Sequence, residues 1–145
     1  SDVGVFVHRS LTGAVIGFTN GCFDIIHPGH LDVLRRCRDL AGPRGTVVVG
    51  VNSDESVRRL KGPDRPVFSE EARCEIVANI NGVDFALTFD EDTPRELLEV
   101  LRPDIIVKGG DYQAADVVGA DLALVIIVPT RPGFSTTDAI RRTGG

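Results

Sequence analysis

The chain has 145 residues, of which 42% are apolar, so it can form one domain of ordinary size around a single core. Its formal net charge of −5 argues against a nucleic-acid partner. No apolar run approaches the roughly 18 residues of a membrane span, and we find no secretory signal. Three cysteines without a Cys-x-x-Cys spacing argue against a disulfide framework and fit the reducing cytoplasm, where we expect the protein to act.

The first predicted elements are a strand and a helix that begins at a proline. We assign residues 1–14 to an N-terminal extension and residues 15–145 to the domain. An apolar run predicts a strand over 15–19, and helically spaced apolar residues predict a helix over 28–40. Pro28 suits the first turn of that helix, because its ring fixes a helical φ and its missing N–H is not needed there.

The middle of the chain continues to alternate strand and helix signals. A β-branched run over 46–51 is typical of a parallel strand that is buried on both faces. Two helices follow, with Ser53 and Ser69 as their N-caps, and a Gly- and Pro-containing loop over 61–68 separates them. A third strand is predicted over 83–89.

The last third of the chain completes the alternation. Thr93-Pro94-Arg95-Glu96 combines a capping box with a proline at the first helical position. Strands are predicted over 104–108 and 124–128, and a final helix begins within 135–138. Alternating strands and helices imply right-handed crossovers, so we expect a single Rossmann-like α/β domain with a doubly wound, parallel, five-stranded sheet.

Polar residues gather after the predicted strands. Ligands of such sheets bind at the carboxyl ends of the strands. The residues in that position are 20–30 after the first strand, Asn52 after the second, 108–112 after the fourth and 131–137 after the fifth.

His27 and His30 flank a Pro-Gly turn where the first strand gives way to the first helix. A helix N-terminus presents unpaired N–H groups and the positive end of a dipole, so two imidazoles there suit a polyphosphate. A purely structural pair is the alternative. A zinc site with Cys22 and Asp24 is conceivable by ligand type, but the spacing matches no common zinc pattern. Neither a Walker loop nor a Gly-x-Gly-x-x-Gly dinucleotide motif is present.

Several segments resemble one enzyme superfamily. Residues 19–30 resemble the first signature of the nucleotidyltransferases that share an H-x-G-H motif, and residues 131–137 resemble their second signature. Within that superfamily, the segments 51–62, 89–94 and 107–112 are similar to those of the D-glycero-β-D-manno-heptose 1-phosphate adenylyltransferases.

The match runs in order from about residue 15 to residue 142. The sequence departs from the family pattern at Gln113 and in a short segment between Val118 and Leu124, and both departures are expected on the sugar side.

The resemblance implies transfer of AMP from ATP to a heptose 1-phosphate, which gives ADP-heptose and pyrophosphate by direct in-line displacement. One alternative is a cytidylyltransferase or another nucleotidyltransferase that acts on a different sugar or polyol phosphate, such as glycerol 3-phosphate. A non-catalytic nucleotide-binding module is a third possibility. No serine, threonine or cysteine lies in a recognisable nucleophile motif, which favours direct displacement.

The resemblance also implies roles for individual residues. The catalytic candidates are His27, His30, Lys61 and Arg131. The nucleotide-binding candidates are Thr19, Asn20, Gly21, Cys22, Phe23, His27, His30, Lys108, Gly109, Asp111, Ser135 and Thr136. The substrate-binding candidates are Asp24, Asn52, Lys61 and Arg73.

Four of these residues have structural alternatives. Asp24 can order its loop, and Lys108 can form a salt bridge at the sheet edge. Capping alone explains Ser135, and Arg73 can be an ordinary helix-surface arginine. We expect Mg²⁺ to accompany ATP, with metal ligands that the sequence does not identify. The expected partners are ATP, a sugar 1-phosphate, a separate upstream sugar kinase and a second copy of the chain in a homodimer.

Overall fold

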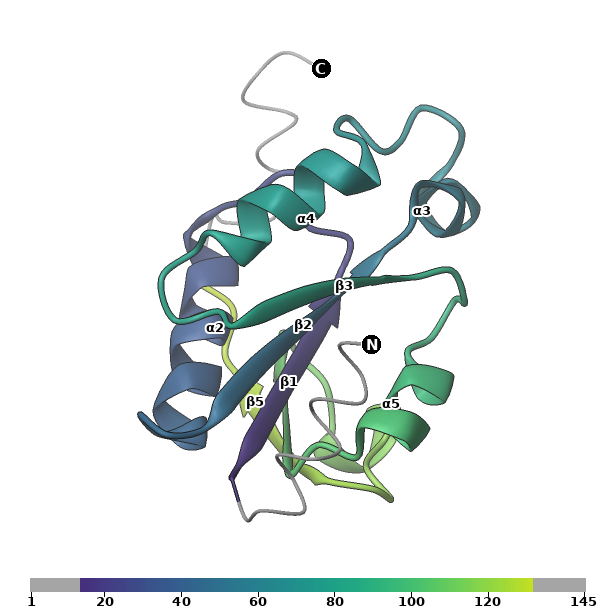
Figure 1. Cartoon of the computed structure of the whole chain (residues 1–145). Helices are drawn as coiled ribbons and strands as arrows, with labels where there is room; N and C mark the ends of the chain where they lie inside the picture. Colours follow the sequence, from purple (N-terminus) through teal and green to yellow (C-terminus); the bar gives the residue numbers. More distant parts are fainter. Residues whose placement is uncertain (1–13, 132–145) are drawn as a thin grey trace.

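The computed structural model describes residues 14–131 and contains a five-stranded sheet (Figure 1). All pairings between neighbouring strands are parallel, and the strand order is β3-β2-β1-β4-β5. The strands are β1 (Ile16–Gly21), β2 (Thr46–Asn52), β3 (Phe85–Phe89), β4 (Ile105–Gly109) and β5 (Leu124–Val128). The expected parallel α/β sheet is therefore confirmed.

Helices cover both faces of this sheet. On one face, α2 (Pro28–Ala41) and α4 (Glu70–Ala78) pack on the odd-numbered valines of β2, and on the other, α5 (Arg95–Leu101) packs on β1 and β4 (Figure 1). The β-branched run of β2 is buried throughout because both faces are covered. The remaining helices are α3 (Asp54–Lys61) and the short 3₁₀ helix η1 (Ala114–Asp116).

The strand order reverses at β1, which has β2 on one side and β4 on the other. The chain first moves outward through β2 and β3 and then crosses back to β4 and β5. At such a switch point the loops after the two central strands diverge and leave a crevice at the carboxyl edge. The fold thus places the loop after β1 opposite the turn after β4.

Some element boundaries differ from the predicted ones. β1 continues to Gly21, and β3 begins only at Phe85. The predicted capping box before α5 is wrong, because Pro94 occupies the N-cap and no side chain caps this helix end. Lys61 is the last residue of α3 and not part of the following loop, and η1 was not predicted from the sequence. Residues 1–13 of the predicted N-terminal extension, and the predicted last helix, lie outside the described residues.

Candidate active site

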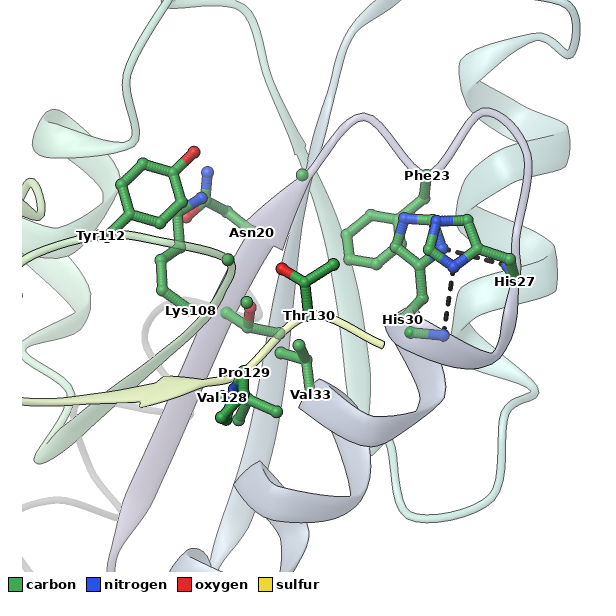
Figure 2. Close-up of a pocket in the computed structure, with 15 residues that line it drawn as sticks. Asn20, Phe23, His27, His30, Val33, Lys108, Tyr112, Val128, Pro129 and Thr130 are labelled. Atoms are coloured by element: carbon green, nitrogen blue, oxygen red, sulfur yellow. Dashed lines mark hydrogen bonds between the residues drawn. The ribbon is translucent and has the colours of Figure 1, made fainter. Parts of the chain in front are cut away.

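A cavity of about 420 Å³ opens at the carboxyl edge of the sheet, at the switch point between β1 and β4. Figure 2 shows Phe23, His27 and His30 at one end of it and Asn20, Lys108 and Tyr112 at the other. Of the residues predicted to contact a nucleotide, the structure brings together here Thr19, Asn20, Gly21, Phe23, His27, His30, Lys108 and Gly109. Gly29, Gly110 and Tyr112 also line the cavity and lie in the segments 20–30 and 108–112, which were predicted at this edge without individual roles. The lining residues that sequence reasoning missed are Val33, Val128, Pro129 and Thr130.

His27 and His30 together cap the N-terminus of α2. His27 is the N-cap residue, and its Nδ1 accepts a hydrogen bond from the backbone N–H of Gly29 at 3.1 Å. The backbone N–H of His27 donates in turn to Nδ1 of His30, also at 3.1 Å. The ring centroids are 4.0 Å apart. Both Nδ1 atoms act as acceptors, so in the neutral rings the proton resides on Nε2, which is left as a donor.

Burial keeps these imidazoles uncharged at neutral pH. Burial, with smaller contributions from the charges of His27 and Lys61, lowers the pKa of His30 from 6.5 to about 4. Burial also lowers the pKa of His27. The ring of Phe23 lies against His30, with centroids 5.3 Å apart, and contributes to this apolar environment. The site therefore presents two neutral Nε2–H donors beside the positive end of a helix dipole.

Lys108 lies at the other end of the cavity, on β4 (Figure 2). Burial lowers the pKa of its ammonium group, and Nζ lies 5.8 Å from the ring centroid of Tyr112. No carboxylate within residues 14–131 forms an ion pair with it, so the salt bridge considered from the sequence is not found there. A cation without a protein counter-charge is well placed to bind an anionic ligand.

The glycines after β4 allow the backbone itself to line the cavity. A Cβ atom at Gly109 would lie 2.8 Å from a methyl group of Val33 in α2. Gly110 has a φ of +119°, and its N–H donates to the carbonyl of Val128. Only glycine adopts such a backbone without strain. Asp111, which was predicted to contact the nucleotide, is exposed and does not line this cavity.

The predicted substrate residue Asp24 instead orders a neighbouring loop. Its buried carboxylate accepts from the N–H groups of Val67 and Phe68 at 2.8 and 3.0 Å and from Nε of Arg65 at 2.7 Å. Burial opposes ionisation, but these three donors together hold the pKa of Asp24 below its usual value. Asp24 thus ties the loop between α3 and α4 to the loop after β1.

Arg73 also occupies a position different from both sequence-based expectations. It is fully buried, so it is neither a helix-surface residue nor open to a substrate. Its guanidinium donates to the carbonyls of Phe68, Cys22 and Asn52 at 2.9, 2.7 and 2.7 Å and to the carboxylate of Asp54 at 2.8 Å. Arg73 therefore fixes the ends of β1 and β2 relative to α4, and its donors are used within the protein.

The remaining predicted site residues within the described part of the chain do not line this cavity. Asn52 is buried, and its amide donates to the hydroxyl of Ser56 at 2.9 Å. Lys61 is exposed at the end of α3 but close enough for its charge to lower the pKa of His30. Arg131 makes two 2.7 Å hydrogen bonds to the carboxylate of Asp32 on α2. The predicted residues Ser135 and Thr136 lie outside the described part of the chain.

The described residues do not form a protein metal site. Between residues 14 and 131, no group of three or more His, Cys, Asp or Glu side chains comes together to hold a metal ion. This includes the zinc arrangement considered from the sequence. Every residue that lines the described cavity lacks a carboxylate, although carboxylate oxygens are the protein ligands that Mg²⁺ prefers. The protein residues at this site therefore do not fit a resident Mg²⁺.

No helix within the described residues is both long and apolar enough to cross a membrane.

Curated relatives match this chain over most of its length. It is 48% identical over 138 residues to the "Bifunctional protein HldE" of Nitrobacter hamburgensis. The aligned region covers 92% of this chain and 28% of that protein. The protein of the same name from Bradyrhizobium diazoefficiens is 49% identical, with 92% and 27% covered. The chain thus spans little more than a quarter of the length of these relatives.

Solved structures share the fold. A lipopolysaccharide core biosynthesis protein from Thermoplasma volcanium matches with a TM-score of 0.64 and 28% identity, covering 81% of this chain and 96% of that one. The pantothenate synthetase of Thermus thermophilus, at 20% identity, matches in fold alone with a TM-score of 0.60, covering 92% and 64% of the two chains. The family model for cytidylyltransferase-like proteins matches residues 18–142, and the chain belongs to that family.

Proposed function

We propose that this domain transfers the nucleoside monophosphate of a nucleoside triphosphate to a sugar phosphate, with ATP and D-glycero-D-manno-heptose 1-phosphate as its substrates. The observation that carries the proposal is the pair of neutral imidazoles at the start of α2, both with Nε2–H left to donate to a ligand. Membership of the cytidylyltransferase-like family supports nucleotidyl transfer.

The proposed reaction is a direct displacement at phosphorus. An oxygen of the acceptor phosphate attacks the α-phosphorus of the nucleotide and forms a new P–O bond. The bond from that phosphorus to the bridging oxygen breaks, and its electron pair leaves with pyrophosphate. Negative charge develops on the oxygens around the α-phosphorus, so the catalyst that is needed is a set of fixed donors. No protein nucleophile takes part.

The residues divide between the two ends of the phosphate chain. His27 and His30 donate from Nε2 to the α and β phosphates, with His30 nearest the bridge between them. The backbone N–H groups of the loop after β1 hold further oxygens, helped by the dipole of the 14-residue helix α2. Lys61 neutralises the attacking phosphate, and Arg131 binds the leaving pyrophosphate after exchanging Asp32 for it. Ser135 and Thr136 are proposed to contact the same pyrophosphate.

Magnesium enters this proposal only with the nucleotide. The chain does not supply a carboxylate cluster for it within residues 14–131, so its ligands would be phosphate oxygens and water. No step above depends on a metal held by the protein.

Similarity to known proteins supports the choice of ATP and a heptose phosphate as substrates. The segments 51–62, 89–94 and 107–112 resemble the heptose 1-phosphate adenylyltransferases. Relatives named "Bifunctional protein HldE" are 47–49% identical, and a relative at 28% identity is named a lipopolysaccharide core biosynthesis protein. A sugar kinase must supply a phosphorylated acceptor, and we propose that the domain acts as a homodimer.

A substrate array tests the proposal. ATP, CTP and GTP are each offered with heptose 1-phosphate, hexose 1-phosphates and glycerol 3-phosphate, and release of pyrophosphate is followed. The expected result is fastest release with ATP and the heptose phosphate. A preference for CTP, or for glycerol 3-phosphate, would contradict the substrate assignment, and no release from any pair would indicate a nucleotide-binding module without catalysis.

A further inference from the structure

We propose, resting on the function proposed above, that a second cavity beside the first is the subsite for the sugar of the acceptor. This cavity has a volume of about 190 Å³. Its walls include Asp92, Thr93 and Asp116, and it shares Asn20, Lys108 and Tyr112 with the larger cavity. None of the three residues on its own side was among the predicted substrate residues.

The shared residues determine where the reaction takes place. Asn20 is the second-last residue of β1, Lys108 belongs to β4, and Tyr112 follows the turn after β4. All three line both cavities, so together they form the boundary between them. In a direct displacement the attacking oxygen must come within about 3–3.5 Å of the phosphorus. If the nucleotide lies in the larger cavity, the acceptor phosphate must therefore lie at this boundary. The ammonium group of Lys108, which has no ion pair within the described residues, lies at this boundary and adds its charge to that of Lys61 in binding the acceptor phosphate.

The far side of the smaller cavity suits hydroxyl groups. Asp92 and Asp116 present carboxylates, which accept hydrogen bonds from sugar hydroxyls, and Thr93 adds a hydroxyl of its own. Asp92 is oriented by Arg59, whose Nε donates to one carboxylate oxygen at 3.0 Å. One water needs about 10–15 Å³ of such volume, so a cavity of about 190 Å³ has room for a ligand many times larger than water, such as a monosaccharide.

The charges on the two sides select the form of the acceptor. A phosphate is attracted at the Lys108 end and repelled at the other end by Asp116, whereas the charge of Asp92 is balanced by its ion pair with Arg59. The acceptor class is therefore a sugar with a single phosphate, at the reacting carbon, and an uncharged hydroxylated remainder. A sugar with a second phosphate at its other end would place that charge against the carboxylate of Asp116.

This assignment also gives a role to two segments that the histidine end of the site does not use. Asp92 and Thr93 belong to the segment 89–94, and Lys108 and Tyr112 belong to the segment 107–112. By contrast, the polar atoms of Asp24 and Arg73, two of the predicted substrate residues, are used within the protein.

The test compares Asp116→Asn and Thr93→Val with the matched control Asp39→Asn, which removes an exposed carboxylate from α2. Calorimetric titration measures binding of heptose 1-phosphate, of the same sugar with a second phosphate at its far end, and of ATP. We expect Asp116→Asn to weaken binding of the monophosphate about 10- to 100-fold, as loss of a hydrogen bond to a charged group does. ATP binding by Asp116→Asn and Thr93→Val should stay within about twofold of wild type, because neither variant loses a hydrogen bond to ATP. For the same reason, the control should bind all three ligands within about twofold of wild type.

The bisphosphate should bind the wild-type protein more weakly than the monophosphate does, and Asp116→Asn should narrow that difference. Because binding is measured directly, the subsite and the reaction are tested separately. If the sugar phosphate binds as expected but no pyrophosphate is released, the proposed function fails and the subsite stands. If pyrophosphate is released but neither variant changes sugar binding, or if the wild-type protein binds no sugar phosphate, the subsite is wrong.

Discussion

The backbone N–H of His27 donates to Nδ1 of His30, while Nδ1 of His27 accepts from the backbone two residues later. Each ring therefore uses one nitrogen to hold the helix start and keeps the other as a donor toward the cavity. The structural alternative considered for this pair and its proposed catalytic role are thus not exclusive, because they use different atoms. The two roles can be separated by substitutions that keep one nitrogen's function and remove the other's.

Asparagine at position 27 should separate capping from catalysis. Its side-chain oxygen can accept from the N–H of Gly29 as Nδ1 does now, and asparagine is among the best N-cap residues. Asparagine has no donor group in the place of the Nε2–H of His27, which is proposed to bind the ligand. We expect His27→Asn to keep wild-type stability and lower kcat by about 100- to 1000-fold, the usual loss for one transition-state donor. Steady-state pyrophosphate release and urea unfolding measure the two effects.

Alanine at the same position is the matched comparison. His27→Ala removes the cap as well as the donor, so it should lose the same activity and in addition about 1 kcal/mol of stability. Equal stability of the two variants would show that the cap contributes little. Wild-type activity of His27→Asn would remove His27 from the catalytic proposal.

The lowered pKa of His30 predicts a stability that falls on mild acidification. The folded pKa is about 4 and the ordinary value is 6.5, so between these pH values the unfolded chain binds more protons than the folded one. The contribution is fully present above pH 6.5 and is lost as the pH falls toward 4. Glutamine at position 30 can still accept from the N–H of His27, as in a capping box, but does not titrate.

Urea unfolding at pH 7 and pH 5 tests whether the free energy of unfolding falls on acidification. The wild-type protein should lose stability between the two, and His30→Gln should lose less. Asp24 does not interfere, because its contribution is present above the ordinary carboxyl value of 3.8 and is lost only below it. A wild-type protein as stable at pH 5 as at pH 7 would contradict the assignment of a neutral His30.

The fold could be read from the sequence because local patterns and tertiary packing agree. The β-branched run of β2 and the helical spacing in α2 each have one stable arrangement in a covered parallel sheet, so both elements were predicted to within a few residues. The pairing of Asp24 with Val67 and Phe68 spans more than forty residues, and no local pattern encodes such a contact.

The site residues likewise differ in whether a local sequence pattern or a tertiary contact positions them. His27 and His30 were identified because they share one short segment with the helix start that positions them. Arg73 was misplaced because an arginine on a short helix is normally solvated. Its burial is favourable only because three backbone carbonyls and Asp54 converge on its guanidinium. Thr130 was missed, and Tyr112 was placed at the ligand-binding edge without a role, because their places in the cavity wall depend on the turn after β4 and the segment after β5.

Substitution of Arg73 should reveal a positioning residue. Its planar group satisfies four acceptors, which the single nitrogen of lysine cannot reproduce. We expect Arg73→Met to destabilise the protein by about 3–5 kcal/mol, because it leaves buried acceptors and Asp54 without their cation. Arg73→Lys should retain part of that stability. Urea unfolding measures both, and a stable Arg73→Lys protein with a raised KM for the acceptor would instead support direct substrate contact.

Arg131 and Asp32 form an exposed pair, so the pair should matter for activity and not for stability. Exposed ion pairs contribute little to folding, since solvent screens them and two long side chains lose freedom. Arg131→Ala should therefore leave the unfolding midpoint unchanged but lower kcat about 100-fold if the guanidinium binds the leaving pyrophosphate. Asp32→Asn is the informative partner variant, because it keeps Arg131 and removes its competing anion. It should bind pyrophosphate at least as tightly as wild type in calorimetric titration.

Weaker pyrophosphate binding by Asp32→Asn, together with full activity of Arg131→Ala, would contradict the proposed role of Arg131. The ion pair would then serve only to hold the segment after β5 against α2.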